Sequence, residues 1–266
     1  MRLGCCGSMI IPESDPIGIA AIEDMARMGF DYVELALGAM MELPEAAFGE
    51  LTRRLAGSGL ACDACGNFFP RRIRLTGADV ELSAALEYAK GALDRAASVG
   101  ARIVVFGCPG AKNVPPGFDG GVAWRQLVEL LRHLGPLAQE RGLTIAIEPI
   151  NRKEGNIVIL AAEGLKLLRA VNHPHVQLLI DYYHLMMERE DPQVVVQAGA
   201  AVCHMHVGQV EGRGLPTQPD AELRRFFEYV RQSGYRGRCS VEGYSTDFAA
   251  DGPPALRTLR ELTEGL

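Results

Sequence analysis

Residues 144–154 decide the fold, and they read Thr144-Ile145-Ala146-Ile147-Glu148-Pro149-Ile150-Asn151-Arg152-Lys153-Glu154. Together with Leu143, the stretch begins as a short apolar run that stops at a carboxylate, and a proline follows at once. A short apolar run between breakers predicts a buried strand, here Leu143–Glu148. A charge at the edge of a core needs a partner. The same pattern returns three times downstream, so the ends of the strands are informative.

Strands of this kind alternate with amphipathic helices along the whole chain, which predicts a parallel sheet with right-handed crossovers. The predicted strands are Leu3–Gly7, Tyr32–Leu37, Leu60–Cys65, Arg102–Phe106, Leu143–Glu148, Val176–Asp181, Ala201–His206 and Cys239–Glu242. The predicted helices are Pro16–Met28 with Asp15 as N-cap, Pro44–Ala56, Asp79–Val99, Val122–Arg141, Ala161–Val171, helical turns up to Ala198, Asp220–Ser233 and Pro254–Leu262.

Eight strand–helix units in 266 residues have the size of an α/β protein with a (β/α)8 TIM barrel fold. We therefore expect one TIM-barrel domain over residues 1–266. The alternative is a doubly wound open sheet. That fold usually has a Gly-rich phosphate loop after its first strand, and Gly4-Cys5-Cys6-Gly7-Ser8 does not match the pattern G-x-G-x-x-G.

Composition excludes several classes of protein. The net charge of −6 argues against a nucleic-acid partner, which usually meets a basic face. No run approaches the ~20 apolar residues of a membrane span, and the N-terminus lacks the apolar region of a signal peptide. Cys62 and Cys65 have the spacing of a redox or zinc motif, but positions three apart in a strand face opposite sides. We expect seven reduced thiols in a cytoplasmic protein.

Polar side chains end the last four predicted strands at intervals of 33, 25 and 36 residues: Glu148, Asp181, His206 and Glu242. In a barrel these residues lie on the C-terminal rim of adjacent strands, where active sites of this fold are found. Three carboxylates brought together repel unless a positive charge lies between them. Three oxygens and one imidazole suit Mn²⁺ or Mg²⁺, and Zn²⁺ or Co²⁺ also fit. The alternative is four separate rim residues, each paired with Arg or Lys.

Further polar residues lie in phase with this rim. His184 is three residues after Asp181, and Glu154 and Arg213 lie on rim loops from which they can reach hydroxyl groups. His204 shares the strand face of His206 one layer deeper. Glu34 alternates with apolar neighbours in the second strand, so a position inside the barrel would require a partner for it.

Each of two rim loops allows two interpretations. Asn67-Phe68-Phe69-Pro70-Arg71-Arg72 can close two aromatic rings over a sugar, with Arg71, Arg72 and Arg74 meeting a phosphate or carboxylate. In the alternative, the phenylalanines pack beneath a helix and the arginines are solvated. The loop that contains Cys108-Pro109-Gly110-Ala111-Lys112 has the composition of a lid or of a contact between the subunits of a homo-oligomer.

These residues resemble a known family. Glu148 with Glu154, Asp181-Tyr182-Tyr183-His184, His204-Met205-His206 with Arg213, and Ser240-Val241-Glu242 are similar to the sugar isomerase/epimerase superfamily of xylose-isomerase-like barrels. Within it the chain most resembles the ketose 3-epimerases of the tagatose and psicose type. The resemblance spans the barrel, and its specific motifs lie in residues 144–244.

The resemblance implies a small-molecule sugar substrate and one divalent metal ion that polarises a ketone and its neighbouring hydroxyl. Glu148 or Glu242 would remove the proton from the adjacent carbon, and the other carboxylate would return a proton from the opposite face. His184 and Arg213 would stabilise the oxyanion, and Glu154 would position a terminal hydroxyl.

Other activities occur on the same barrel. They are hydroxypyruvate or inosose isomerisation, dehydration by an inosose or dehydroshikimate type of enzyme, cleavage at abasic sites in DNA by a zinc endonuclease, and metal or sugar binding without turnover. The endonucleases need further histidines after the third and fourth strands, and this chain has none there.

Overall fold

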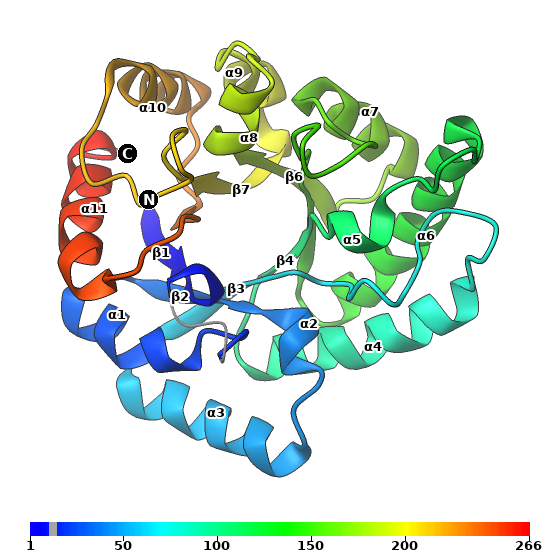
Figure 1. The fold of residues 1–266 in the computed structure, drawn as a ribbon, viewed down its shortest axis with the longest axis horizontal. Coiled ribbons are helices and arrows are strands. Elements are labelled where there is room, and N and C mark those ends of the chain that lie inside the picture. The colour runs from blue at the N-terminus through cyan, green and yellow to red at the C-terminus, as the bar shows by residue number, and fades with distance from the viewer. Residues whose placement is uncertain (11–14) are drawn as a thin grey trace.

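The computed structural model describes residues 1–10 and 15–266. Eight parallel strands close into a barrel in chain order, and the helices surround them (Figure 1). The strands are β1 (Arg2–Cys6), β2 (Tyr32–Ala36), β3 (Ala61–Gly66), β4 (Ile103–Phe106), β5 (Thr144–Ile147), β6 (Val176–Asp181), β7 (Val202–Val207) and β8 (Arg238–Val241). The predicted TIM barrel is therefore confirmed. β1 pairs with both β2 and β8, which closes the ring.

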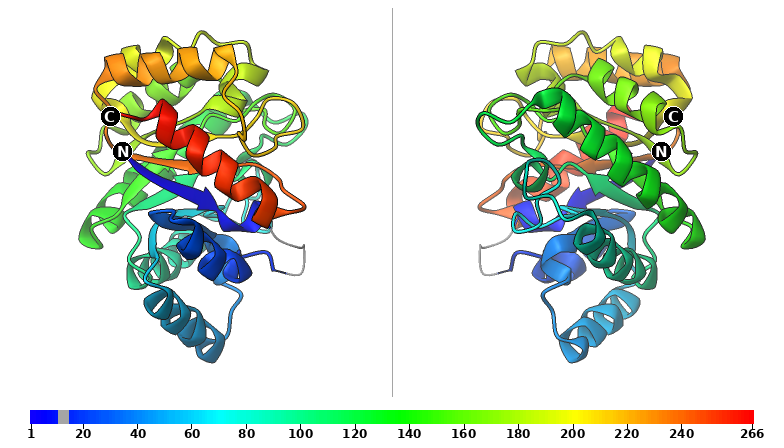
Figure 2. Two further views of the ribbon diagram at one scale, coloured as in Figure 1. Left: turned by 90° about the vertical axis from the view of Figure 1, so that its left-hand side faces the viewer. Right: turned by 90° about the vertical axis from the view of Figure 1, so that its right-hand side faces the viewer.

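The helices of the described residues lie outside the strands, as both side views show (Figure 2). They are α1 (Ile22–Met28), α2 (Leu37–Met40), α3 (Glu45–Ser58), α4 (Leu82–Ser98), α5 (Pro109–Lys112), α6 (Gly120–Glu140), α7 (Ala161–Val171), α8 (Tyr182–Met187), α9 (Val194–Ala198), α10 (Ala221–Ser233) and α11 (Phe248–Leu262), with 3-10 turns η1 (Gly7–Met9), η2 (Ile19–Ala21) and η3 (Gly199–Ala201). Within the described part of the chain, no helix combines the length and apolarity that a membrane crossing requires.

Two helix starts differ from the prediction. Asp15 accepts hydrogen bonds from the backbone N–H groups of Gly18 and Ala20. It therefore closes a turn, and α1 begins only after Gly18, whose φ of 97° is left-handed. The last helix begins six residues before Pro254, at Phe248, because the Asp247 side chain accepts from Ala250 N and caps it. A side-chain cap thus decides where α11 starts, whereas α1 has no side-chain cap and follows the turn at Asp15.

The core has two parts, one on each face of the strands. A large apolar cluster packs between the strands and the helices. A smaller one, of alternating strand residues, fills the interior of the barrel: Tyr32, Ala64, Ile103, Val105, Ala146 and Leu179. A Cβ at Gly4 would overlap the Tyr32 ring, so glycine makes room for that side chain. The site described below lies above this layer.

The expectation that Cys62 and Cys65 face opposite sides of β3 is wrong. Their Sγ atoms are 4.0 Å apart, and both side chains are buried in the larger apolar cluster. The pairing of β3 with β2 shifts by one residue between Ala61 and Ala64. An extra residue in a bulge changes the alternation of sides, which brings the two thiols together.

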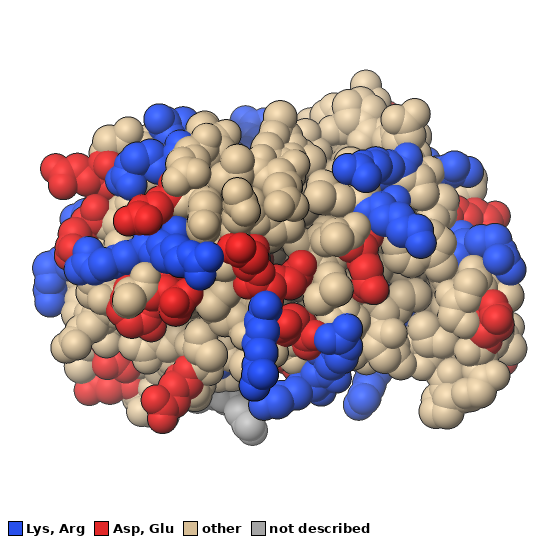
Figure 3. Space-filling model, turned by 90° about the horizontal axis from the view of Figure 1, so that it is seen from above, with Lys and Arg blue, Asp and Glu red and all other residues tan. Residues whose placement is uncertain are grey.

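On the face that Figure 3 draws, Lys and Arg side chains lie among Asp and Glu side chains, and large areas carry neither. The two ends of the chain meet, since the Met1 amino group donates to the Leu266 carbonyl over 3.0 Å.

Candidate active site

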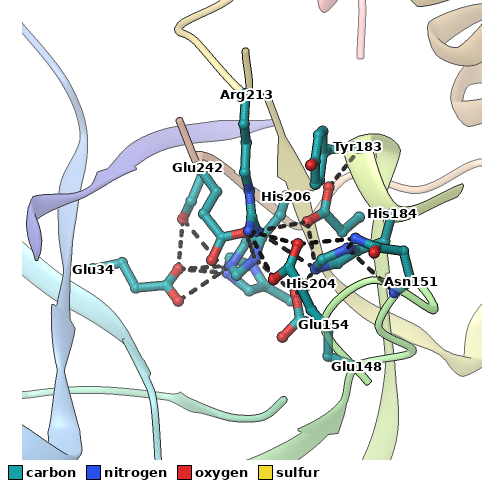
Figure 4. A network of polar contacts seen from close by, with 12 residues as sticks. Glu34, Glu148, Asn151, Glu154, Tyr183, His184, His204, His206, Arg213 and Glu242 are labelled. Carbon is teal, nitrogen blue, oxygen red and sulfur yellow. Dashed lines mark hydrogen bonds and ion pairs between the residues drawn. The ribbon is translucent and has the colours of Figure 1, made fainter. Parts of the chain in front are cut away.

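The four predicted metal ligands come together at the carboxyl ends of β5 to β8. Figure 4 shows three of them, Glu148, His206 and Glu242. Two of the strands end one residue earlier than predicted, so Glu148 and Glu242 are the first residues after β5 and β8. Asp181 is the last residue of β6, and His206 is the last but one of β7. His206 Nδ1 lies 3.3 Å from Glu148 Oε1 and 3.5 Å from Glu242 Oε2.

Three of these residues have a buried polar atom without a hydrogen-bond partner among the described residues: Glu148 Oε1, Asp181 Oδ2 and His206 Nδ1. Leaving a buried polar atom unpaired costs about 1–3 kcal/mol. A divalent cation bound between these atoms would be a partner for all three, and carboxylate oxygens with an imidazole nitrogen suit it chemically. The residues present therefore fit a metal ion.

His184 lies in the same place, since one group of possible ligand atoms that all lie within 4.8 Å of one another contains Glu148, Asp181, His184 and Glu242. Its hydrogen bonds separate it from His206. The side-chain amide of Asn151 lies 2.7 Å from His184 Nδ1, and the Asn151 backbone N–H also points to that atom. Nδ1 is therefore the acceptor, and Nε2 carries the proton. His184 is thus a hydrogen-bond donor toward the site.

His206 has the opposite arrangement. Its Nε2 lies 3.1 Å from Glu34 Oε2, so Nε2–H donates and Nδ1 faces the carboxylates. Glu34 also meets His204 Nε2 at 2.8 Å and accepts from Ser240 Oγ at 2.7 Å. The buried Glu34 thus has the partners that its position requires. A carboxylate behind a metal-binding histidine sets the ring's tautomer and orientation, which favours His206 over His184 as a ligand.

Charges in the site depend on one another. Burial, with the nearby Glu242 and Glu148, raises the pKa of Asp181 to about 7. Burial also opposes the charge of Glu242, but His206 and Arg213 outweigh it and hold the pKa of Glu242 well below its usual range. Despite burial, Glu34 and Glu242 raise the pKa of His206 well above its usual value. These shifts favour a proton on His206 and on Asp181 and disfavour one on Glu242.

The predicted substrate-binding residues surround the same point. Arg213 Nη2 donates to Glu242 Oε2 over 2.5 Å, and its Nη1 lies 3.1 Å from Glu154 Oε2. The side chain of Asn151 donates to Glu154 Oε1 over 2.9 Å. The guanidinium of Arg213 lies 4.6 Å above the Tyr183 ring. Asn151, Tyr183 and the role of Glu34 were missed in the sequence, although Asn151 lies within the stretch 144–154.

A cavity of about 450 Å³ opens above these residues. Apart from the polar residues already described, the first strands and their loops contribute to its walls: Cys6, Ser8, Met9, Leu35, Ala36, Asn67, Val105 and Cys108. Within residues 1–10 and 15–266, the only Lys or Arg on these walls is Arg213. Its charge is already paired with Glu154 and Glu242.

The two rim loops adopt structural roles. Phe68 and Phe69 are buried, and the Phe69 ring packs against Tyr88 of α4 and Phe106 of β4. Arg72 pairs with Glu42 at 2.7 Å. Arg74 donates to the Gly110 carbonyl over 2.8 Å. The phenylalanines are therefore packed within the protein, as one of the two interpretations of this loop predicted. Arg72 and Arg74 have partners within the protein.

The loop after β4 supports Glu148 from behind. Lys112 at the end of α5 is fully buried, and its Nζ donates to the Glu148 carbonyl over 2.8 Å. Burial lowers the pKa of this lysine. A Cβ at Gly107 would overlap Glu148 Oε2, so glycine leaves the space that the carboxylate occupies. The segment with the composition of a lid or subunit contact is therefore also a support for a site residue.

Comparison with known proteins agrees with this geometry. A family model described as "Xylose isomerase-like TIM barrel" matches residues 22–264. An L-ribulose 3-epimerase of Methylomonas sp. (strain DH-1) is 28% identical over 235 residues, which are 86% of this chain and 79% of that protein. A ketose 3-epimerase of Arthrobacter globiformis is 24% identical over 257 residues, or 94% of this chain and 86% of that protein.

A solved structure is also similar. The crystal structure of a D-psicose 3-epimerase in the presence of D-fructose has a TM-score of 0.89 to this chain, with 19% identity and coverage of 98% of this chain and 99% of that one. At this identity the likeness concerns the fold. The family match over nearly the whole barrel goes further, and the chain belongs to the xylose isomerase-like TIM barrel family.

Proposed function

We propose that this protein is a divalent-metal-dependent sugar epimerase or isomerase that acts on a ketose or a related polyol-ketone. The observation that carries the proposal is a set of three buried atoms that have no hydrogen-bond partner among the described residues: Glu148 Oε1, Asp181 Oδ2 and His206 Nδ1. They belong to residues at the ends of three adjacent strands. Glu148, Asp181, His206 and Glu242 would hold the ion, and their oxygen-rich set favours Mn²⁺ or Mg²⁺.

When bound, the metal ion would act as a Lewis acid on the substrate's carbonyl and neighbouring hydroxyl. Glu148 and Glu242 carry the proton transfer. They come from β5 and β8, which are not neighbours in the barrel, so they reach a substrate from different sides. One removes the proton from the carbon beside the carbonyl, and the other supplies a proton to the opposite face. The configuration of that carbon decides which carboxylate acts first.

Hydrogen-bond donors stabilise the charge that develops on the substrate oxygen. His184 Nε2–H points into the site, as its Nδ1 is occupied by Asn151. Arg213 adds a guanidinium that already contacts Glu242 and keeps that carboxylate ionised. Such preorganised donors are worth several kcal/mol in the barrier, about 2.7–4 kcal/mol for one donor in a typical case. Glu154, held by Asn151 and Arg213, is placed to bind a hydroxyl.

The cavity favours a substrate without a phosphate group. Arg213 is the one cation among the Lys and Arg of the described chain that lines it, and two carboxylates already pair with this residue. Arg72 and Arg74 are held elsewhere. A sugar phosphate would bring two negative charges to a site that has no free cation for them among the described residues. We expect catalysis on ketoses that carry no phosphate group, inside a reducing cytoplasm in which the cysteines remain thiols.

Deuterium uptake tests the proposal. The metal-loaded protein is incubated in D2O with a panel of free ketoses, inososes and hydroxypyruvate, and exchange at the carbon beside the carbonyl is followed by NMR. Glu148→Gln and Glu242→Gln should each abolish exchange, while Glu87→Gln on the exposed side of α4 should retain it. Exchange retained in both site variants would sink the proposal.

The product distinguishes the reactions that share this first step. Epimerisation and isomerisation conserve the mass of the sugar, whereas a dehydratase releases water. A product lighter by one water would therefore replace the epimerase with a dehydratase. Bound metal without any exchange across the panel would instead favour a binding protein.

A further inference from the structure

A second cavity lies outside the proposed active site. Its volume is about 470 Å³, and Glu154, Arg213 and Tyr244 line both cavities. The two cavities are therefore neighbours, and these three residues form their common border. The outer cavity is otherwise formed by residues of the loops after β5 and β7 and by α8.

Its walls combine charged groups with exposed apolar side chains. Among the described residues, the large hydrophobic side chains that are exposed are Val210, at 38%, and Tyr244, at 60%. Both line this cavity, together with Met187 and the ring of Tyr183. Exposed apolar groups that gather at one place mark a binding surface more often than scattered ones do.

The position of Tyr244 is held by the backbone. Its N–H donates to the Arg213 carbonyl over 2.7 Å, and Gly214 pairs with Tyr244 in a short parallel bridge. A Cβ at Gly243 would overlap the Gly214 carbonyl, so the loops after β7 and β8 touch there. These backbone contacts fix the loop that carries the exposed Tyr244 ring. Little conformational freedom is therefore lost when a ligand packs on the ring.

The part of the cavity wall that contains Tyr183 is also held by contacts within the protein. The Tyr183 ring lies against the guanidinium of Arg213 (Figure 4). Lys153 and Glu154 add a hydrogen-bond donor and an acceptor at the edge. Glu154 pairs with Arg213, which leaves Lys153 as the remaining charge among the lining residues. A saturated ring with hydroxyls at its edge suits such walls, since its C–H face packs on aromatic carbon and its hydroxyls reach the polar side chains.

We propose that the outer cavity binds an uncharged second sugar ring, joined to the sugar that reacts in the inner cavity. The proposal rests on the proposed function, and it adds that the preferred substrates are keto-sugars larger than a monosaccharide. Tyr244 and Val210 bind the second ring.

Binding of mono- and disaccharides tests this subsite. The dissociation constants of D-fructose, lactulose and maltulose are measured by NMR titration on the metal-loaded protein. Lactulose and maltulose both carry a second ring on a ketose. At least one of them should bind more tightly than D-fructose, and Tyr244→Ala should reduce that preference by about tenfold, as expected for one lost ring contact.

Two control variants sharpen the result. Tyr244→Phe keeps the ring and should keep most of the preference. Tyr229→Ala removes a tyrosine of α10 that lies against Arg225 and should change neither constant. If D-fructose binds as well as both disaccharides, or if the preference survives in Tyr244→Ala, the subsite does not exist. A change of mass in light scattering with Tyr244→Ala would show that the ring contacts a second copy and would also overturn the proposal.

The experiments distinguish a failure of the proposed epimerase activity from a failure of the proposed subsite. A lack of deuterium exchange with every ketose refutes the epimerase and leaves the binding preference measurable. Exchange with D-fructose, without any preference for a disaccharide, refutes the subsite alone.

Discussion

Glu34 Oε2 accepts a hydrogen bond from His206 Nε2 over 3.1 Å, and this contact turns Nδ1 of the same ring toward Glu148, 3.3 Å away. The two residues are 172 positions apart in the chain. Glu34 accepts the hydrogen bond from Nε2–H, so the lone pair of His206 is on Nδ1. This lone pair is directed to the place where three buried atoms, Nδ1 among them, lack partners among the described residues.

Glu34→Gln should therefore weaken metal binding by about 10–100-fold, as for other residues behind a metal-bound histidine. Glutamine has nearly the same shape, but it lacks the charge and places an NH2 group among His204 and Ser240. The dissociation constant for Mn²⁺ is measured by competition with a chelator. Ser240→Ala is the control, because it removes a donor to Glu34 and leaves the contact with His206, so its effect should be smaller. Equal constants for Glu34→Gln and the unchanged protein would contradict this role.

Gly107→Ala should lower kcat by about 100-fold, the loss expected when a catalytic group moves by about 1 Å. The new Cβ would overlap Glu148 Oε2 and displace the carboxylate. Steady-state kinetics of the variant are compared with those of Gly57→Ala. Gly57 lies in α3, where an added Cβ would meet no other atom within 4 Å. That change should stabilise the protein by about 0.5–1 kcal/mol and spare kcat. Full activity in Gly107→Ala would mean that catalysis does not depend on the observed position of the Glu148 carboxylate.

Metal binding should raise Tm more at pH 8 than at pH 5.5. In the metal-free protein burial raises the pKa of Asp181 to about 7, above about 3.9 in the unfolded chain. Its contribution to stability is therefore fully present below the unfolded pKa and is lost as the pH rises through about 7. A cation needs the ionised form and is favoured where that contribution is lost. Scanning calorimetry with and without Mn²⁺ checks this, and a Tm shift that is equal or larger at pH 5.5 would refute it.

Phe69→Ala should destabilise the protein by about 3–5 kcal/mol, the usual cost of removing a buried aromatic ring. Phe69 packs on Tyr88 and Phe106 and does not line the cavity. Urea denaturation measures the change, and KM of the folded fraction should remain the same. Arg72→Ala serves as the comparison, since its exposed pair with Glu42 should contribute less than about 1 kcal/mol. A higher KM at unchanged stability would instead place Phe69 over the substrate.

The barrel and the position of its candidate site were predictable from the sequence, because both depend on local period. Apolar runs with helices between them predict the strand order, and polar residues such as Asp181 and His206 recur at the ends of the last four strands. In a closed barrel, residues at the same end of adjacent strands must lie near one another. Local pattern was insufficient where a turn, a cap or a bulge intervened, as at Asp15, Asp247 and the pair Cys62 and Cys65.

The tertiary structure alone decided how the site residues divide their roles. The sequence placed His184 and His206 on one rim, but only their partners, Asn151 and Glu34, show which nitrogen of each ring faces the site. The sequence also did not reveal that Lys112 donates a hydrogen bond to the Glu148 carbonyl. These contacts join residues 33 to 172 positions apart. Periodicity shows which face a side chain occupies, whereas its hydrogen-bond partner depends on how the barrel closes.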